Sequence, residues 1–255
     1  MKHELVKDYF EVYKIREMRI EDILEYLETE DNHPTFVLPL IYTLFKNYNK
    51  ENLYRNKYFK LLFDNKKLIS KEEYFSEIST NREQGERLPN EIFNLFDKNE
   101  AIRYVFNELI DNVYRHSNFD FGLIYCRNYN DFAEFAIFDN GNSIPGTFRL
   151  AGLDIGDDST IIIKALSGLS SKEDIGTGLN SSYKIITGGF KGQFLISSAK
   201  GVVSFTDYKK EIIYKGQYLH GTLVSFTVPT PIKKFSIYDG FISKGEFIHY
   251  LWKEK

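Results

Sequence analysis

Two residues near the middle of the chain have types and spacing that suit metal and base chemistry. Glu108 and Asn112 are four residues apart in the predicted helix 101–117, so they lie on one side of it. An asparagine carbonyl oxygen can coordinate a hard cation, and a glutamate can orient or deprotonate a nucleophile. The pair lies at the edge of the apolar stripe, where a cleft can form, although such residues are usually bystanders on a helix surface.

The segment D-N-G-N-S-I-P, residues 139–145, follows a predicted strand. A carboxylate at a strand end, here Asp139, can accept a hydrogen bond from an exocyclic amine such as that of adenine. Gly141 would let the backbone approach a flat ring closely. Asp, Asn and Gly are also the favoured turn residues, so a plain turn is the simpler interpretation of this segment alone.

Glycines and a hydroxyl mark two further segments. Gly176 and Gly178 come just before a predicted helix, where backbone N–H groups bind anions, and Lys172 is near enough in sequence to meet a terminal phosphate. Thr222 begins a strand and can place a hydroxyl near a base. Each segment alone is equally an ordinary loop or strand start, and it is their order along the chain that gives them weight.

The elements that must position these residues alternate irregularly between helix and strand. Besides the helix 101–117, a helix at 181–187 ends at two glycines. Strands are predicted at 121–129, 132–139, 193–198, 202–208, 211–214 and 222–228. This order predicts an α+β fold, a two-layer α/β sandwich in which helices cover one face of a mixed sheet.

The polar stretch at residues 79–90 is the predicted domain boundary. Residues 1–90 are predicted to form a smaller, mainly helical partner or packing domain, with an amphipathic helix around residues 18–27. Residues 91–235 form the predicted ligand-binding domain, and residues 236–255 form an aromatic tail.

Composition narrows the protein class. The chain has 255 residues, of which 42% are hydrophobic and 27% charged, as in an ordinary globular protein. The net charge of −3 gives no global reason to expect nucleic-acid binding. No apolar run is long enough to span a bilayer, and the first residues lack an apolar signal region, so we expect a cytoplasmic protein without a membrane partner. The single cysteine, Cys126, excludes an internal disulfide and is expected to pack within a strand.

In this order the four segments resemble the GHKL family of ATPases and kinases. N-E-L-I-D-N resembles the N box, D-N-G-N-S the first glycine box, G-T-G-L the second, and G-T-L-V-S-F-T-V-P the third. The resemblance covers residues 107–229, about half of the chain. It implies the Bergerat ATP-binding fold with a mobile lid at about residues 143–176.

The resemblance also implies roles for individual residues. Asp139 would bind the adenine amine, Asn112 would hold Mg²⁺, and Glu108 would be the general base. The remaining ATP contacts that it implies are Gly141, Lys172, Gly176, Thr177, Gly178, Leu179 and Thr222. The sequence departs from the family pattern at Ser143 and Asn180, where glycines are usual, and these departures leave nucleotide turnover open.

Glu108 separates the branches of this family. Sensor histidine kinases usually carry Asn there, whereas Glu is typical of the hydrolysing members and the anti-sigma serine kinases. His3, His33 and His116 do not lie where a phospho-accepting histidine helix would place one. Residues 230–255 are too few for the transducer domain of the gyrase and MutL members, so we expect the output to run through the N-terminal region or a partner protein.

Three functional hypotheses follow. The leading one is a regulatory protein that binds ATP and magnesium, and then hydrolyses ATP or phosphorylates a protein partner. A STAS-like partner is suggested by analogy alone, and a homodimer is compatible with the sequence. The alternative is a non-catalytic ATP sensor that exposes a partner surface when its lid closes. A scaffold with an inactive pocket is the third.

Overall fold

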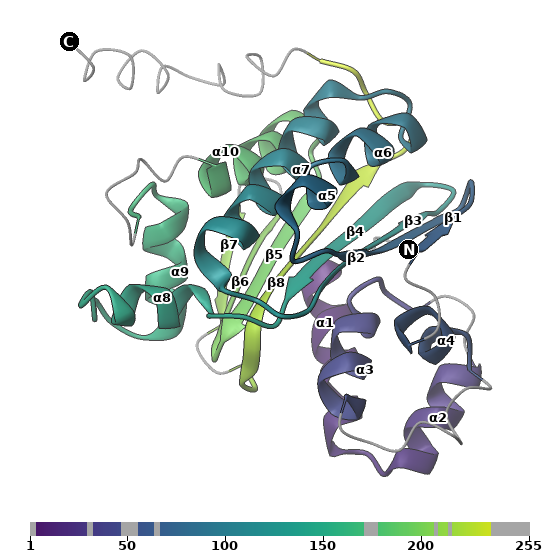
Figure 1. Cartoon of the computed structure of the whole chain (residues 1–255), viewed down its shortest axis with the longest axis horizontal. Coiled ribbons are helices and arrows are strands. Elements are labelled where there is room, and N and C mark those ends of the chain that lie inside the picture. Colours follow the sequence, from purple (N-terminus) through teal and green to yellow (C-terminus); the bar gives the residue numbers. More distant parts are fainter. Residues whose placement is uncertain are drawn as a thin grey trace.

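The molecule is built on one eight-stranded sheet (Figure 1). The computed structural model describes residues 4–29, 33–46, 56–63, 67–170, 178–206, 209–213 and 216–235. The strand order is β1-β2-β3-β4-β8-β5-β6-β7. The strands are β1 (Lys67–Ile69), β2 (Glu73–Ile78), β3 (Gly122–Asn128), β4 (Phe132–Asp139), β5 (Gln193–Ala199), β6 (Gly201–Thr206), β7 (Lys209–Ile213) and β8 (Leu219–Pro229).

The α+β fold class is confirmed, but the sheet is antiparallel and not mixed. Every pair of neighbouring strands in the described part of the chain is antiparallel. The helical connection between β4 and β5 does leave these two strands parallel to each other. The last strand, β8, lies between them and is antiparallel to both, so they are never neighbours.

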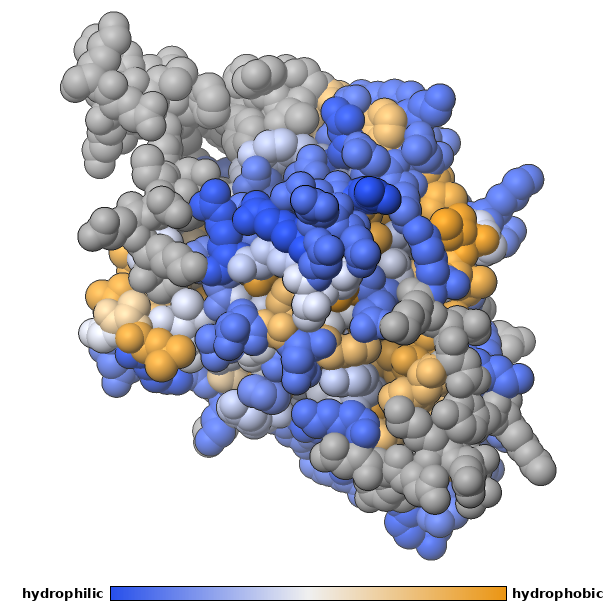
Figure 2. All heavy atoms as spheres, viewed as in Figure 1, coloured by the Kyte–Doolittle hydropathy of each residue, from blue (hydrophilic) through white to orange (hydrophobic). Residues whose placement is uncertain are grey.

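One face of the sheet is covered by helices that lie within residues 82–184. These are α5 (Arg82–Gly85), α6 (Leu88–Leu95), α7 (Glu100–Asn112), α9 (Asp158–Leu166) and α10 (Gly178–Lys184), with α8 (Ile144–Leu150) beside α9. The predicted apolar stripe of α7 is buried against the sheet, and Asn99 caps the helix by accepting from the N–H groups of Ala101 and Ile102. The outer surface over α5 and α7 is hydrophilic (Figure 2).

The opposite face is covered as well, which differs from the predicted helices on one face. Here lie α1 (Leu5–Tyr13), α2 (Ile20–Thr29), α3 (Val37–Phe45) and α4 (Lys57–Phe63), with a 3₁₀ turn at Lys14–Glu17. They share a buried core with the side chains that the sheet presents on this face, including Phe75, Tyr125 and Phe138. The reason is visible in β3 and β4, which are almost continuously buried and apolar and therefore need cover on both faces. We call α1 to α4 the N-terminal layer.

Polar contacts fix this layer to the sheet. The hydroxyls of Tyr9 and Ser197 are 2.6 Å apart, and the Leu5 N–H donates to Gln193 at 2.8 Å. The strands β1 and β2 precede residue 90, yet β1 pairs with β2 and β2 pairs with β3, so the sheet draws on both sides of the predicted domain boundary. That boundary stays a prediction, and the aromatic tail from residue 236 lies outside the described residues.

Two expectations about single features can be compared with the fold. Cys126 is buried in β3, as predicted. None of the described helices combines the length and apolar character needed to cross a bilayer.

Candidate functional site

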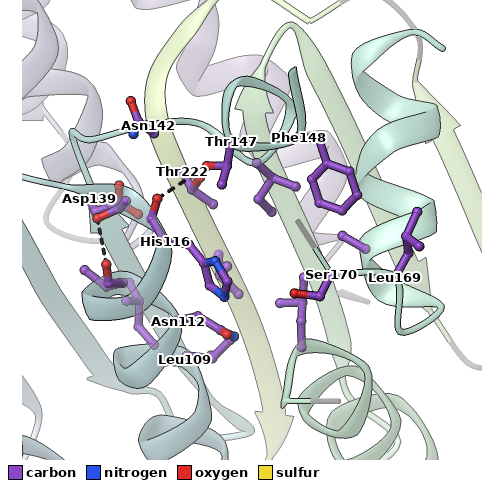
Figure 3. A pocket seen from close by; sticks show the side chains of 17 residues that line it. Leu109, Asn112, His116, Asp139, Asn142, Thr147, Phe148, Leu169, Ser170 and Thr222 are labelled. Carbon is purple, nitrogen blue, oxygen red and sulfur yellow. Dashed lines mark hydrogen bonds between the residues drawn. The ribbon is translucent and has the colours of Figure 1, made fainter. Parts of the chain in front are cut away.

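A cleft opens where β4 ends and β8 begins, between α7 on one side and α8 and α9 on the other (Figure 3). It holds about 790 Å³ of empty space, a figure that includes space open to solvent. Its lining is mostly apolar with a few polar groups. The lining residues are Leu109, Asn112, Val113, His116, Ser117, Ile137, Asp139, Asn142, Ile144, Thr147, Phe148, Ala165, Leu169, Ser170, Leu179, Thr222 and Val224.

Asp139 and Thr222 lie together in the cleft. They are directly opposite each other on the neighbouring strands β4 and β8. Gly221 makes this pairing possible, since its φ is +99° and an added Cβ would lie 1.9 Å from the Asp139 carbonyl oxygen. The Thr222 hydroxyl is 2.9 Å from that of Ser198, which also accepts from the Ile144 N–H at 2.9 Å. Ser198 therefore joins Thr222 of β8 to Ile144, at the start of α8, in the cleft wall.

The Asp139 carboxylate is buried and 4% exposed, so its charge is poorly solvated. Burial raises the pKa of Asp139 from 3.8 to about 7, and hydrogen bonds from the Gly141 N–H, at 3.0 Å, and from Ser117 oppose this rise. The Ser117 hydroxyl also donates to the Val113 carbonyl oxygen at 2.8 Å. Near neutral pH this carboxylate can therefore switch between an acceptor and a protonated donor.

Asn112 is the last residue of α7, and the chain continues as one π-helical turn, Val113–Ser117. This turn carries the side chains of His116 and Ser117 into the cleft wall beside Asn112. The Nδ2 atom of Asn112 is buried and has no hydrogen-bond partner among the described residues. Because the two ends of an amide are exchangeable by rotation, this side chain fits either a donor to a phosphate or an oxygen ligand to a metal.

Glu108 lies one helical turn earlier and does not line the cleft. Its carboxylate is half-buried against the start of α10, where a Cβ added to Gly178 would lie 2.1 Å from Glu108 Oε2. Burial raises the pKa of Glu108, while a hydrogen bond with Tyr104 lowers it. A side chain at position 178 would therefore have to displace the Glu108 carboxylate.

The second glycine box is described only in part. Leu179 lines the cleft and Gly178 begins α10, whereas Lys172, Gly176 and Thr177 lie outside the described residues. Asn180, at a position where the family usually has glycine, donates its side-chain amide to the Leu166 carbonyl at the end of α9. Its side chain therefore joins two helices, which a glycine could not do.

Gly141 and Ser143 have structural roles in the loop after Asp139. A Cβ added to Gly141 would lie 2.1 Å from the Ser117 carbonyl oxygen, so the close approach is to the end of the π turn. The N–H of Asn142 donates to the same oxygen. Ser143 caps α8 by accepting from the Gly146 N–H at 3.0 Å. Gly141 does not line the cleft, and its predicted contact with a base stays a prediction.

The described part of the predicted lid, residues 143–170, forms the far wall of the cleft. Phe148 and Leu169 face Asn112 and His116 across the opening (Figure 3). This wall is held at two points, since the Thr147 hydroxyl donates to the His116 carbonyl at 3.3 Å and Asp158 accepts from the Lys200 N–H at 2.9 Å. Residues 171–176 of the predicted lid lie outside the described residues.

The structure brings together four of the predicted site residues. Asn112, Asp139, Leu179 and Thr222 line one cleft although they come from four separate segments. Thr147, Phe148 and Leu169 fall within the predicted lid but could not be singled out, because nothing in a hydrophobic pattern marks which side chains border an opening. No family model, curated protein or solved structure matches the chain.

Proposed function

We propose that this chain is a regulatory protein of the GHKL type that binds Mg-ATP in the cleft beside Asp139. The observation that carries the proposal is the convergence of Asn112, Asp139, Leu179 and Thr222, residues from the four segments that resemble the family boxes. A pattern assembled from weak, widely separated signals would scatter over the surface if it arose by chance. Here it meets in one cleft that combines apolar walls with a few polar groups.

The base end of the ligand fits the floor of the cleft. An ionised Asp139 accepts a hydrogen bond from the exocyclic amine of adenine, and burial makes that bond strong. Thr222, on the opposite strand, presents a hydroxyl to the same ligand edge. Apolar side chains of Ile137, Val224 and Leu109 supply flat contact area for the ring.

The phosphate end fits the α7 wall. Asn112 offers an amide that has no hydrogen-bond partner among the described residues, and His116 lies beside it. Mg²⁺, when bound, neutralises phosphate charge and needs only one or two protein ligands besides the phosphates and water. Glu108, with a raised pKa, is one turn away beside Gly178 and is the residue we assign to orienting or deprotonating an attacking water or hydroxyl.

A second candidate is a non-catalytic ATP sensor. It is favoured by one observation, that the Glu108 carboxylate packs against α10 and does not line the cleft. In a sensor, nucleotide binding would stabilise one arrangement of the cleft wall without bond cleavage. The two candidates share the ligand and differ in turnover.

Isothermal titration calorimetry with Mg-ATP tests the shared part. Wild-type protein should bind, and Asp139→Asn should weaken binding at least about a hundredfold because a buried charge-assisted hydrogen bond is lost and a donor opposes the amine. Asp131→Asn is the matched control, an exposed aspartate on the same β3–β4 hairpin, and should bind as wild type does. Equal affinity in wild type and Asp139→Asn would remove the proposal.

Phosphate release separates the two candidates. An enzyme should release phosphate from Mg-ATP above background, and Glu108→Gln should abolish the release while keeping the calorimetric affinity. Background release from both proteins with intact affinity would favour the sensor. The scaffold hypothesis requires that Mg-ATP cause no rise in melting temperature, because occupancy of a folded site must stabilise it.

A further inference from the structure

The loop that carries Asp139 is held from the opposite face of the sheet. Asn140 follows Asp139 directly and is buried. Its Oδ1 atom accepts from the N–H groups of Asp120, at 3.2 Å, and Phe121, at 2.9 Å, while its own N–H donates to the Phe121 carbonyl at 2.9 Å. Asn140 Nδ2 also donates to the Asp120 carboxylate. Four hydrogen bonds thus fix the position of Asn140 relative to the start of β3.

A residue of the N-terminal layer completes this contact. Tyr42, on α3, stacks on Phe121 with ring centroids 3.7 Å apart and planes 9° from parallel. Its hydroxyl accepts from Asn140 Nδ2 at 3.4 Å, and its ring lies 6.2 Å from that of Phe138. Helix α3 therefore contacts Asn140, the neighbour of Asp139, through a residue that lies 98 positions earlier in the chain.

The two neighbouring side chains point to opposite sides. Successive side chains of an extended strand alternate between faces, so Asp139 enters the cleft and Asn140 turns toward the N-terminal layer. The two residues share one planar peptide unit, so a displacement of Asn140 acts on Asp139 through that unit and the φ and ψ angles beside it. The accuracy with which Asp139 meets a ligand amine therefore depends on where α3 lies.

We propose that Tyr42 and Asn140 are positioning residues through which the N-terminal layer sets the affinity of the cleft for adenine nucleotide. This inference rests on the proposed function, since it takes the cleft as the nucleotide site. Linkage is reciprocal, so nucleotide in the cleft also stabilises the docking of α3 on the sheet. A partner that displaced α3 would weaken nucleotide binding, and one that held α3 in place would strengthen it.

The test is a set of Kd values for Mg-ATP measured by calorimetry. Tyr42→Ala removes the stacking and the hydroxyl, and should raise Kd at least about fivefold, the lower end of typical coupling between sites. Tyr42→Phe keeps the stacking and loses only the hydroxyl, so it should raise Kd by a smaller, measurable factor. Tyr26→Phe is the control, because Tyr26 is a half-buried tyrosine of the same layer whose ring contact is with His33.

A double-mutant cycle distinguishes positioning from general loss of stability. Tyr42→Phe and Asn140→Ala each remove one side of the same hydrogen bond, so their effects on Kd should be less than additive. Amide hydrogen exchange at residues 139–142 should quicken in Tyr42→Ala and not in Tyr26→Phe.

Two negative outcomes are distinct. A wild-type protein that does not bind Mg-ATP would refute the proposed function, and this inference with it. A wild-type protein that binds, while Tyr42→Ala melts earlier but keeps the wild-type Kd, would refute the positioning role alone. Additive effects of Tyr42→Phe and Asn140→Ala on Kd would also count against it.

Discussion

Strand β4 carries two buried carboxylates, one on each face of the sheet, and they are held in different ways. Glu134 faces the N-terminal layer, is 0% exposed, and accepts from the N–H and the hydroxyl of Thr35, each at 2.9 Å. Asp139 faces the cleft and has a pKa raised to about 7. Both are acidic residues in an apolar strand, yet one is enclosed by the protein and the other borders an opening.

These two residues show that burying a carboxylate can serve either structure or ligand binding. A buried charge is costly unless it is paired or hydrogen-bonded, and Glu134 meets this need with donors from α3's leading segment. At Asp139 the hydrogen bonds from Gly141 and Ser117 lower the pKa, but burial raises it by more. A ligand amine would supply the missing donor. We therefore assign Glu134 to holding the two layers together and Asp139 to binding.

The largest expected effect sharpens this assignment. Glu134→Ala leaves the Thr35 donors buried without their acceptor and should lower the free energy of unfolding by about 3–5 kcal/mol, measured by urea denaturation. Glu134→Gln keeps an acceptor and should cost less. The Mg-ATP affinity of the folded protein should fall far less than in Asp139→Asn. Loss of affinity with unchanged stability would reverse the assignments of the two carboxylates.

The second expected effect is a gain in the free energy of unfolding, whereas Glu134→Ala causes a loss. Asp139 titrates near 3.8 when unfolded and near 7 when folded, so the unfolded chain loses its proton first as pH rises. This group therefore lowers the free energy of unfolding progressively between about pH 4 and pH 7, and the cost stays constant above pH 7. Asp139→Asn removes this cost.

We expect Asp139→Asn to be more stable than wild type at pH 8, on the order of 2–4 kcal/mol, and closely similar at pH 4. Urea denaturation at pH 4, 6 and 8 measures both differences. The variant would thus gain stability as it loses binding, which is expected where a ligand site is held under electrostatic strain. A variant less stable than wild type at pH 8 would show that the carboxylate, like Glu134, is a structural group.

The comparison also marks how far the sequence can predict such a site. Helix α7 and strands β3 and β4 follow local patterns, because periodicity and strand ends are local properties. The meeting of Asn112, Asp139 and Thr222 is predicted by the resemblance to the GHKL boxes and not by local patterns. The N-terminal layer on the second face and the insertion of β8 between β4 and β5 could not be predicted, because both depend on long-range packing. The roles of Gly141 and Asn180 also required the structure, since each depends on one backbone neighbour.

The smallest effect concerns Asp139 and Ser117 together. The ionised carboxylate accepts from an amine more strongly than the protonated group does, so with a pKa of about 7 the affinity for Mg-ATP should rise by up to about tenfold from pH 6 to pH 8. Ser117→Ala removes a hydrogen bond that lowers the pKa of Asp139, and should shift the midpoint of this rise to higher pH. Adenosine, titrated by NMR, is the ligand control because it has no phosphate to titrate. A midpoint that stays in place in Ser117→Ala would mean that Ser117 serves the Val113 carbonyl and not the carboxylate, whereas a flat profile for adenosine would mean that Asp139 is not the group that reads the base.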